Sequence, residues 1–178
     1  MKELKEFTIP FVGLKAGEHT YNFEITNKFF EHFEYDEFND ANIHLGVLLN
    51  KKATLLELTL SFKGSLNVNC DTTNEPYDQI VDGQYHFVVK FGDEFNDDNE
   101  DILILPNGSH EINIRQYIYE SIVLAMPTRR IHPGIEDGTL KSEILEKLEE
   151  LSPKLEKETE KESTDPRWDD LKKLLTDK

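Results

Sequence analysis

The feature that most constrains the fold of this chain is an unbroken alternation of apolar and polar residues over positions 56–70. Successive side chains of a β-strand point to opposite faces, so the pattern predicts one long strand with a buried face and a solvated face. Gly64 lies in the middle of the buried row, where a bend or bulge would let so long a strand curl. The row comprises Leu56, Leu58, Leu60, Phe62, Gly64, Leu66, Val68 and Cys70.

Shorter alternating rows predict further strands in the first hundred residues. These rows are Tyr21–Ile25, Ile43–Leu49 and Tyr85–Phe91. Residues 50–53, Asn-Lys-Lys-Ala, supply a hairpin turn into the long strand. Asn27 is placed to cap a short helix over Lys28–Phe33.

Helical spacing replaces the alternation after Pro106. One apolar stripe could cover the open face of the sheet, and it ends before Pro127, because the residue before a proline is pushed out of the helical region. Residues 128–138 carry Pro and Gly and predict a loop, whereas residues 139–151 carry a second stripe and predict another helix. The first stripe comprises Ile114, Ile118, Ile122 and Ala125.

A strongly charged segment and a short amphipathic helix end the sequence. Residues 152–164 are almost all Glu, Lys, Ser and Thr, a composition that cannot bury enough apolar surface, so they predict a tether or an exposed helix. Asp165 and Pro166 are typical of a helix start, and an apolar face follows at helical spacing. A helix this short is marginal alone in water and needs a surface, either on its own core or on a partner. Its apolar face comprises Trp168, Leu171, Leu174 and Leu175.

These patterns together predict an α+β fold. One-sided strands of such length need a core to wrap around, so we expect a strongly curved antiparallel sheet, with a near-closed barrel as its limiting form. Packed helices and a tethered C-terminal amphipathic helix complete it. The predicted parts are a β-rich core with its packing helix (1–135), a charged helix and tether (136–164), and the amphipathic helix (165–178).

Charge excludes several classes of partner. Thirty-six acidic residues against twenty basic ones leave a formal net charge of −16. This charge repels phosphate backbones and anionic lipids, which argues against DNA, membranes and non-specific RNA binding. The single cysteine excludes an intramolecular disulfide, and the sequence shows neither a signal peptide nor a long apolar run. We therefore expect a cytoplasmic protein that binds neither DNA nor membranes.

No constellation of catalytic or metal-binding residues stands out. The six histidines lack the paired spacing of a metal site, and no base accompanies a nucleophile. Cys70 has no cation beside it in sequence to lower its pKa, which favours a buried structural thiol. The acidic run Asp93–Asp101 lacks the ligand spacing of a calcium loop, so a solvated loop is the simpler interpretation. We expect no enzymatic activity, no metal and no cofactor.

Residues 102–135 depart from the acidic trend, because they hold three of the four arginines. Guanidinium groups suit phosphates and stacked bases, so these side chains are candidates for RNA or partner contact. The alternative is that they pair with carboxylates of the chain itself. The three are Arg115, Arg129 and Arg130.

Four stretches carry a family resemblance. Strand residues 64–71 run into a cysteine turn, and the acidic run precedes Ile102–Leu105. Residues 120–127 read Glu-x-Ile-x-Leu-Ala-x-Pro, and residues 165–174 read Asp-Pro-Arg-Trp-x-x-Leu-Lys-x-Leu. In this order the stretches resemble the YceD family of bacterial and plastid proteins, known as large ribosomal RNA subunit accumulation proteins. The last two motifs are the more specific pair.

The resemblance implies a non-enzymatic factor that supports accumulation of the large-subunit ribosomal RNA during assembly of that subunit. Many relatives carry a second cysteine three residues after the first and further Cys or His after the proline, and a zinc site is suspected in them. Here Thr73 and the run 128–133 occupy those places, so the resemblance does not extend to a metal site.

The charge restricts how such a factor could act. It favours either a defined structured site on large-subunit RNA or a precursor particle, or a basic ribosomal or assembly protein. A different class stays open: a small-molecule-binding β-barrel, or a protein-interaction module unrelated to the ribosome, although the bulky inner rows favour a filled interior. Trp168 and Leu171 would anchor the C-terminal helix on a partner. The candidate contact residues are Arg115, Arg129, Arg130, Arg167, Trp168, Leu171, Lys172 and Lys173.

Overall fold

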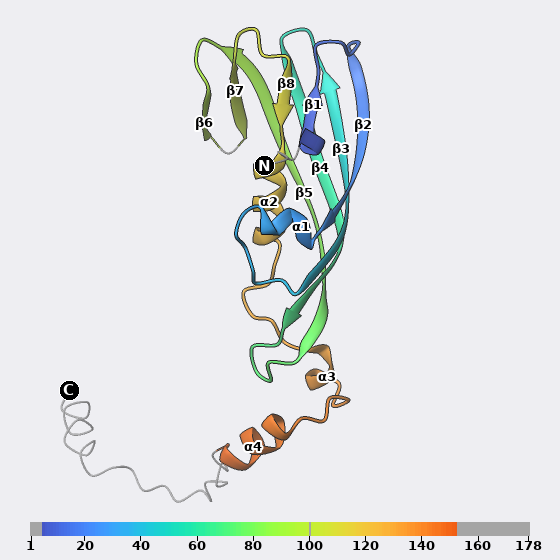
Figure 1. Cartoon of the computed structure of the whole chain (residues 1–178), viewed down its shortest axis with the longest axis vertical. Helices are drawn as coiled ribbons and strands as arrows, with labels where there is room; N and C mark the ends of the chain where they lie inside the picture. The colour runs from blue at the N-terminus through green and yellow to red at the C-terminus, as the bar shows by residue number, and fades with distance from the viewer. Residues whose placement is uncertain (1–4, 100, 153–178) are drawn as a thin grey trace, which may run out of the picture. The chain divides into compact units, whose positions relative to one another are not determined.

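In the computed structural model, which describes residues 5–99 and 101–152, the long alternating run forms the strand β4 in a six-stranded sheet. The strand order is β2-β3-β4-β5-β7-β6 (Figure 1). The predicted hairpin turn joins β3 to β4, where the Lys52 N–H donates to the carbonyl of Leu55 at 3.0 Å. The strands are β2 (Gly17–Thr26), β3 (Asp40–Lys51), β4 (Leu55–Asn69), β5 (Pro76–Gly92), β6 (Asn96–Asn99) and β7 (Ile102–Pro106).

Burial follows the predicted alternation along β4. Its even-numbered side chains are buried from Leu56 to Val68 apart from the half-buried Gly64, while most odd-numbered ones are half-buried or exposed. The pairing of β4 with β3 and β5 continues through Gly64 without a shift of register, so a bulge there is wrong, while the bend stays a prediction. A Cβ there would lie 2.1 Å from the carbonyl oxygen of Asn42, so glycine is needed because the two backbones approach closely.

The sheet is open and mixed, so the near-closed barrel is not confirmed, and the antiparallel expectation is wrong for the pairing of β7 with β5. Among the described strands, β2 and β6 are the two edges. β7 runs parallel to β5, with Val88–Gly92 opposite Ile102–Pro106, and it lies between β5 and β6. The acidic run, expected as a loop, forms the edge strand β6. Alternation fixes which face of a strand is buried, but it does not fix strand order or direction.

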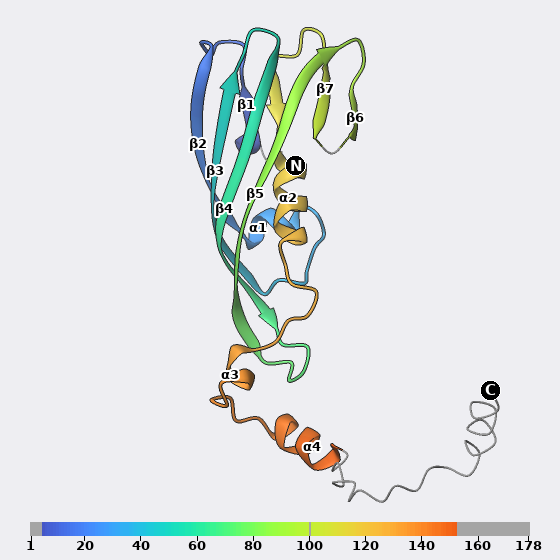
Figure 2. The same ribbon diagram turned by 180° about the vertical axis from the view of Figure 1, so that it is seen from behind.

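A second layer covers the buried face of the sheet, and this removes the need for closure. Figures 1 and 2 show α1, α2, β1 and β8 on one side of the sheet. The predicted stripe of α2 is confirmed, because Ile118 and Ile122 are buried against the strand rows. A two-stranded antiparallel sheet adds Ile9 and Ile112 to the same core. The elements are a 3-10 helix (Lys5–Phe7), β1 (Thr8–Pro10), α1 (Asn27–Glu31), β8 (Glu111–Asn113) and α2 (Arg115–Leu124).

The start of α1 differs from its prediction. Asn27 is the first helical residue, and Thr26 takes the N-cap position without a side-chain hydrogen bond. The Oδ1 atom of Asn27 is buried and has no hydrogen-bond partner among the described residues. The predicted cap is therefore wrong, and the helix is instead held by the buried rings of Phe29 and Phe30.

Two helix boundaries near the end of the described chain also differ. The predicted loop 128–138 contains α3 (Pro133–Glu136), because Pro133 suits the first turn and the Nδ1 atom of His132 accepts the Gly134 N–H at 2.9 Å. α4 (Glu143–Leu151) begins after Ser142, whose hydroxyl accepts the Ile144 N–H, so the start expected at residue 139 is wrong.

The described residues fall into two units, one ending at Leu140 and one beginning at Lys141. The described part of the second unit holds α4, whose residues are mostly exposed. Within the described residues, no helix is both long and apolar enough to cross a membrane. The predicted limits at residues 135 and 164 stay predictions. The tether beyond Ser152 and the candidates Arg167, Trp168, Leu171, Lys172 and Lys173 lie outside the described residues.

Candidate functional site

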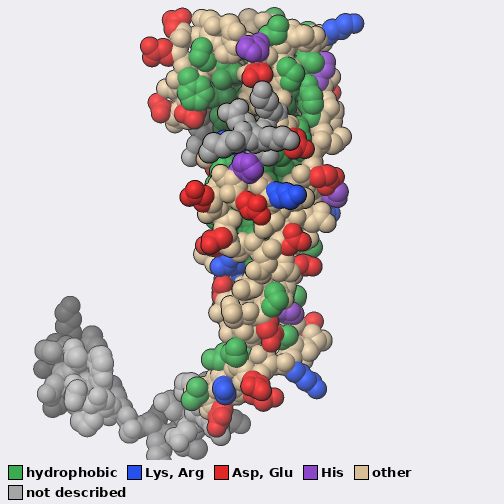
Figure 3. All heavy atoms as spheres, viewed as in Figure 1, with side chains coloured by type: hydrophobic (Ala, Val, Ile, Leu, Met, Phe, Trp, Pro, Cys, Tyr) green, Lys and Arg blue, Asp and Glu red, His purple; other side chains and the backbone are tan. Residues whose placement is uncertain are grey.

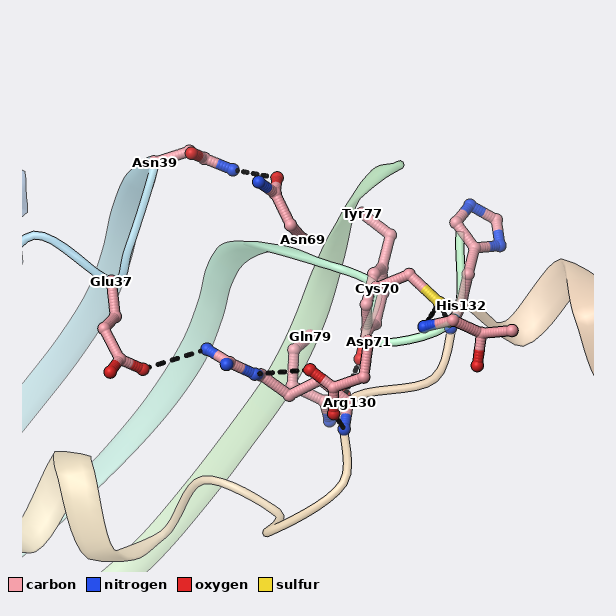
Figure 4. A network of polar contacts seen from close by, with 10 residues as sticks. Glu37, Asn39, Asn69, Cys70, Asp71, Tyr77, Gln79, Arg130 and His132 are labelled. Atoms are coloured by element: carbon pink, nitrogen blue, oxygen red, sulfur yellow. Dashed lines mark hydrogen bonds and ion pairs between the residues drawn. The ribbon is translucent and has the colours of Figure 1, made fainter. Parts of the chain in front are cut away.

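Two segments far apart in sequence meet where β4 ends and β5 begins, in a region that we call the junction. It consists of the turn 70–75 and the segment 127–132 that follows α2. The Asp71 N–H donates to the Arg130 carbonyl at 2.8 Å, and the Arg130 N–H donates to Asp71 Oδ2 at 2.7 Å. This reciprocal pair fixes the two backbones against each other (Figure 4).

The side chain of Arg130 is held by carboxylates of the chain itself. Its Nη1 lies 3.1 Å from Glu37 Oε2, and its Nε lies 3.5 Å from Asp71 Oδ1. Only 28% of the side chain is exposed. Figure 4 shows Arg130 between these two acids, which come from different parts of the chain. Little of this guanidinium remains for an outside ligand.

The other two candidate arginines have different surroundings. Arg129 is exposed, and it forms no hydrogen bond or ion pair with any residue in 5–99 or 101–152. Arg115 begins α2, and its guanidinium lies 5.5 Å from the centre of the Phe33 ring. The ten residues of α2 separate Arg115 from Arg129, roughly 15 Å along the helix axis. The arginines therefore do not form one patch.

Cys70 lies at the centre of the junction and is 2% exposed. Burial alone would raise the pKa of its thiol, but hydrogen bonds from His132, Thr73 and Thr72 outweigh this and lower it to about 7. The His132 N–H lies 3.3 Å from the sulfur, and the Thr72 N–H lies 3.4 Å from it. The expected burial of the thiol is confirmed, but its pKa is lowered without a cation, by backbone amides and the Thr73 side chain, and one of these donors comes from 62 residues further along the chain.

Tyr77, near the start of β5, packs beside the junction. Tyr77 is buried, and burial followed by the charges of Cys70 and Asp71 raises the pKa of its phenol. Its hydroxyl donates to Gln79 Oε1 at 3.1 Å, and its ring centre lies 5.4 Å from that of His132. Among residues 5–99 and 101–152, no three His, Cys, Asp or Glu side chains gather in a group that could hold a metal ion. The described contacts thus hold the turn and the segment after α2 together, although Glu75 Oε2 is buried without a hydrogen-bond partner among the described residues.

A second region lies beside α2, and we call it the α2 groove. It consists of two hollows on either side of Tyr117, with volumes of about 430 Å³ and 330 Å³. The first hollow is lined by β4, β5 and α2, including Tyr85, Glu120 and Leu124. The second is lined by β6, β7, β8 and α2, including Phe95, Asp97, Leu105 and Glu111.

Tyr117 separates the two hollows of the groove. Its ring stacks on that of Phe87, with the ring centres 4.5 Å apart. Burial, and then the charges of Asp97, Tyr85 and Glu120, raise the pKa of its phenol to about 12. Asp97 and Glu120 line different hollows, and Tyr117 lines both.

The sequence-based reasoning missed the groove. Its most exposed apolar residues are Leu124 and Phe95. Leu124 lies off the buried stripe of α2, and Phe95 is an aromatic residue inside the acidic run. Both are apolar residues that break the local pattern. That departure from the pattern was the available signal.

Comparison with known proteins decides the family. The sequence model of a family described as large ribosomal RNA subunit accumulation protein YceD matches residues 58–175, about two thirds of the chain. The chain belongs to the YceD family. This confirms the resemblance found in the four sequence motifs. No curated protein and no solved structure matches the chain.

The YceD match covers most of both regions described above. It begins within β4 and includes Cys70, Asp71 and Arg130 of the junction, as well as all the groove residues of β5, β6, β7, β8 and α2. Glu37 precedes it. Nearly all the residues of the two regions thus lie in the part of the chain that matches the YceD family.

Proposed function

We propose that this YceD protein is a non-enzymatic factor of large ribosomal subunit biogenesis, which supports accumulation of the large-subunit ribosomal RNA in the cytoplasm. The observation that carries the proposal is the family match over residues 58–175, because the family is described by that role. The protein acts by binding a precursor particle, through structured RNA or through a ribosomal or assembly protein.

The described side chains favour contact through protein. RNA-binding surfaces track phosphates with several Lys and Arg side chains. Here the guanidinium of Arg130 is paired with Glu37 and Asp71, and that of Arg115 lies over Phe33. Arg129 is left as the one arginine of the described residues without such a contact, within a chain of net charge −16. A single RNA contact through Arg129 is the alternative.

The structure does not support the alternative of a ligand-binding barrel. The sheet is open, and its inner rows are filled by buried side chains such as Leu58, Leu60 and Phe87. The two hollows lie beside α2 and are open to the surface rather than enclosed by strands. We therefore do not propose a small-molecule carrier.

Sedimentation tests the proposal. Tagged protein from gently lysed cells is separated on a sucrose gradient at low and high salt, and RNA and proteins of each fraction are identified. We expect the protein with large-subunit precursors, and we expect its removal from the cell to lower large-subunit RNA relative to small-subunit RNA. Persistence at high salt supports a protein contact, whereas loss at high salt together with loss in Arg129→Gln supports the RNA contact. Absence from every particle fraction with unchanged RNA levels contradicts the proposal.

A further inference from the structure

We propose that the α2 groove binds a cationic amphipathic segment of a partner protein. Apolar side chains of the segment enter the hollows on either side of Tyr117, and its Lys or Arg side chains meet Asp97, Glu111 and Glu120. The inference rests on the proposed function only for the source of the segment, a basic protein of the precursor particle. The binding itself follows from the groove.

Two apolar side chains of the groove are exposed to solvent. Leu124 lines the first hollow and is 82% exposed, and Phe95 lines the second and is 57% exposed. Both belong to the same surface, because Tyr117 lines both hollows. Figure 3 shows hydrophobic side chains at the end of the structure where Figure 1 draws β6, β7 and β8, with acidic side chains nearby. An apolar patch with a polar rim is typical of a protein-binding surface.

The charge of the groove favours a positively charged partner segment. Three carboxylates line the groove against one guanidinium, that of Arg115. Neither Asp97 nor Glu111 forms an ion pair with any residue the structure describes, and Glu120 accepts a hydrogen bond only from the neutral Gln116, at 2.6 Å. Opposite charge across an interface steers encounter and selects the partner.

The same charge disfavours two other occupants. A nucleic acid would bring phosphates against the three carboxylates. A second copy would bring another chain of net charge −16 against an acidic groove. Basic ribosomal or assembly proteins offer the required combination, and a helix that presents apolar anchors on one face fits a groove alongside α2.

Peptide binding to the full-length protein tests the inference. The probe is a fluorescent synthetic helix of Lys and Leu with one apolar face, and its counterpart carries Glu in place of every Lys. By fluorescence anisotropy we expect only the Lys peptide to bind. Leu124→Ser and Phe95→Ser should each weaken it about tenfold, since exposed apolar anchors dominate such interfaces. Glu120→Gln and Asp97→Asn should each weaken it about threefold.

Matched controls separate the groove from general attraction to an acidic protein. Ile80→Ser changes a side chain that is 62% exposed on β5 and does not line the groove, and Glu18→Gln removes an exposed carboxylate on β2. Both should leave the affinity unchanged. Equal weakening by Ile80→Ser and Leu124→Ser overturns the inference, and so does equal binding of the Lys and Glu peptides. Thermal melting confirms that each variant is folded.

Two further outcomes assign the groove to another occupant and also overturn the inference. One is self-association of the chain that Leu124→Ser abolishes. The other is binding of a single-stranded RNA oligonucleotide that Leu124→Ser abolishes. Sedimentation of Leu124→Ser separates this inference from the proposed function. If the variant loses the peptide but stays with precursor particles, the groove is not the ribosomal contact, while the function stands. If the unchanged protein binds the peptide but never meets the particles, the function fails alone.

Discussion

The junction and the α2 groove are built by the same sheet and the segments on either side of α2, but they treat their side chains in opposite ways. In the junction, Arg130, Asp71 and Cys70 all bond within the chain. In the groove, Leu124 and Phe95 stay exposed beside carboxylates without ion pairs. In this acidic protein Arg130 therefore stabilises the fold, and the proposed contacts with a partner are made by apolar and acidic residues.

The largest expected effect comes from Gly64→Ala, which disturbs the sheet under both regions. The new Cβ would meet the Asn42 carbonyl oxygen at 2.1 Å and the Ile43 Cα at 2.6 Å. Both are backbone atoms that cannot turn aside, so we expect the free energy of unfolding to fall by about 3 kcal/mol. Urea denaturation measures it. Gly46→Ala is the control, because its Cβ would meet nothing nearer than 3.8 Å. Equal stability of both variants would show that the close approach is not a constraint.

The next largest effect tests whether the junction is structural. Arg130→Ala removes the contacts to Glu37 and Asp71 and leaves Asp71 without its cation. We expect a loss of about 2 kcal/mol in unfolding free energy. The neighbouring Arg129→Ala is the matched control, with a change within about 0.5 kcal/mol, since its side chain is exposed. Similar losses in both variants would show that the paired Arg130 stabilises the fold no more than its exposed neighbour does.

A smaller effect is the pH dependence that Cys70 adds to the junction. The pKa of its thiol in the folded chain is about 7, below the ordinary value of 9.0, so the folded state releases the proton first. The resulting stabilisation is fully present above pH 9 and is lost as the pH falls through 7. The stability difference between the unchanged protein and Cys70→Ser should therefore grow from pH 7 to pH 9. Thiolate absorbance gives the midpoint directly, and a midpoint above 9 would refute the lowered pKa.

The smallest expected effect tests whether residues 165–178 bind a partner or pack on the protein's own core. If residues 165–178 serve a partner, as the groove does, Trp168→Ala should change the free energy of unfolding by less than about 0.5 kcal/mol. Co-sedimentation with precursor particles should weaken, while Lys147→Ala, on exposed α4, should leave it unchanged. A fall in melting temperature of many degrees would instead place Trp168 in the protein's own core, with the junction.

Local periodicity was enough to predict β2, β3, β4, β5 and the main helix, but it did not predict β1, β6, β7 or β8. The buried rows of β2, β3, β4 and β5 and the stripe of α2 lie where alternation and helical spacing placed them. The order and direction of the strands could not be predicted from local patterns. The parallel pairing of β7 with β5, for example, depends on the path of the chain between Gly92 and Ile102. The near-closed barrel was inferred from the length of one-sided strands, and it is not confirmed, because the sheet is open and a second layer covers its buried face.

The candidate site was less predictable than the fold. The sequence drew attention to Arg130 and Cys70, but their partners lie far away along the chain: Glu37 is 93 residues from Arg130, and His132 is 62 residues from Cys70. Such pairings follow from tertiary packing and leave no local pattern. Leu124 and Phe95 did leave one, because each is apolar where its surroundings predict a polar residue.

The edge strand β6 has a consequence for how these molecules behave toward one another at high concentration. An open sheet ends in unpaired N–H and C=O groups, which can recruit a strand of another molecule and begin aggregation. At this end the last strand is only four residues long, wholly exposed, and carries Asp97 and Asp98. A short edge with adjacent negative charges makes edge-to-edge pairing of two such sheets unfavourable. The acidic run therefore disfavours strand pairing at this edge of the sheet.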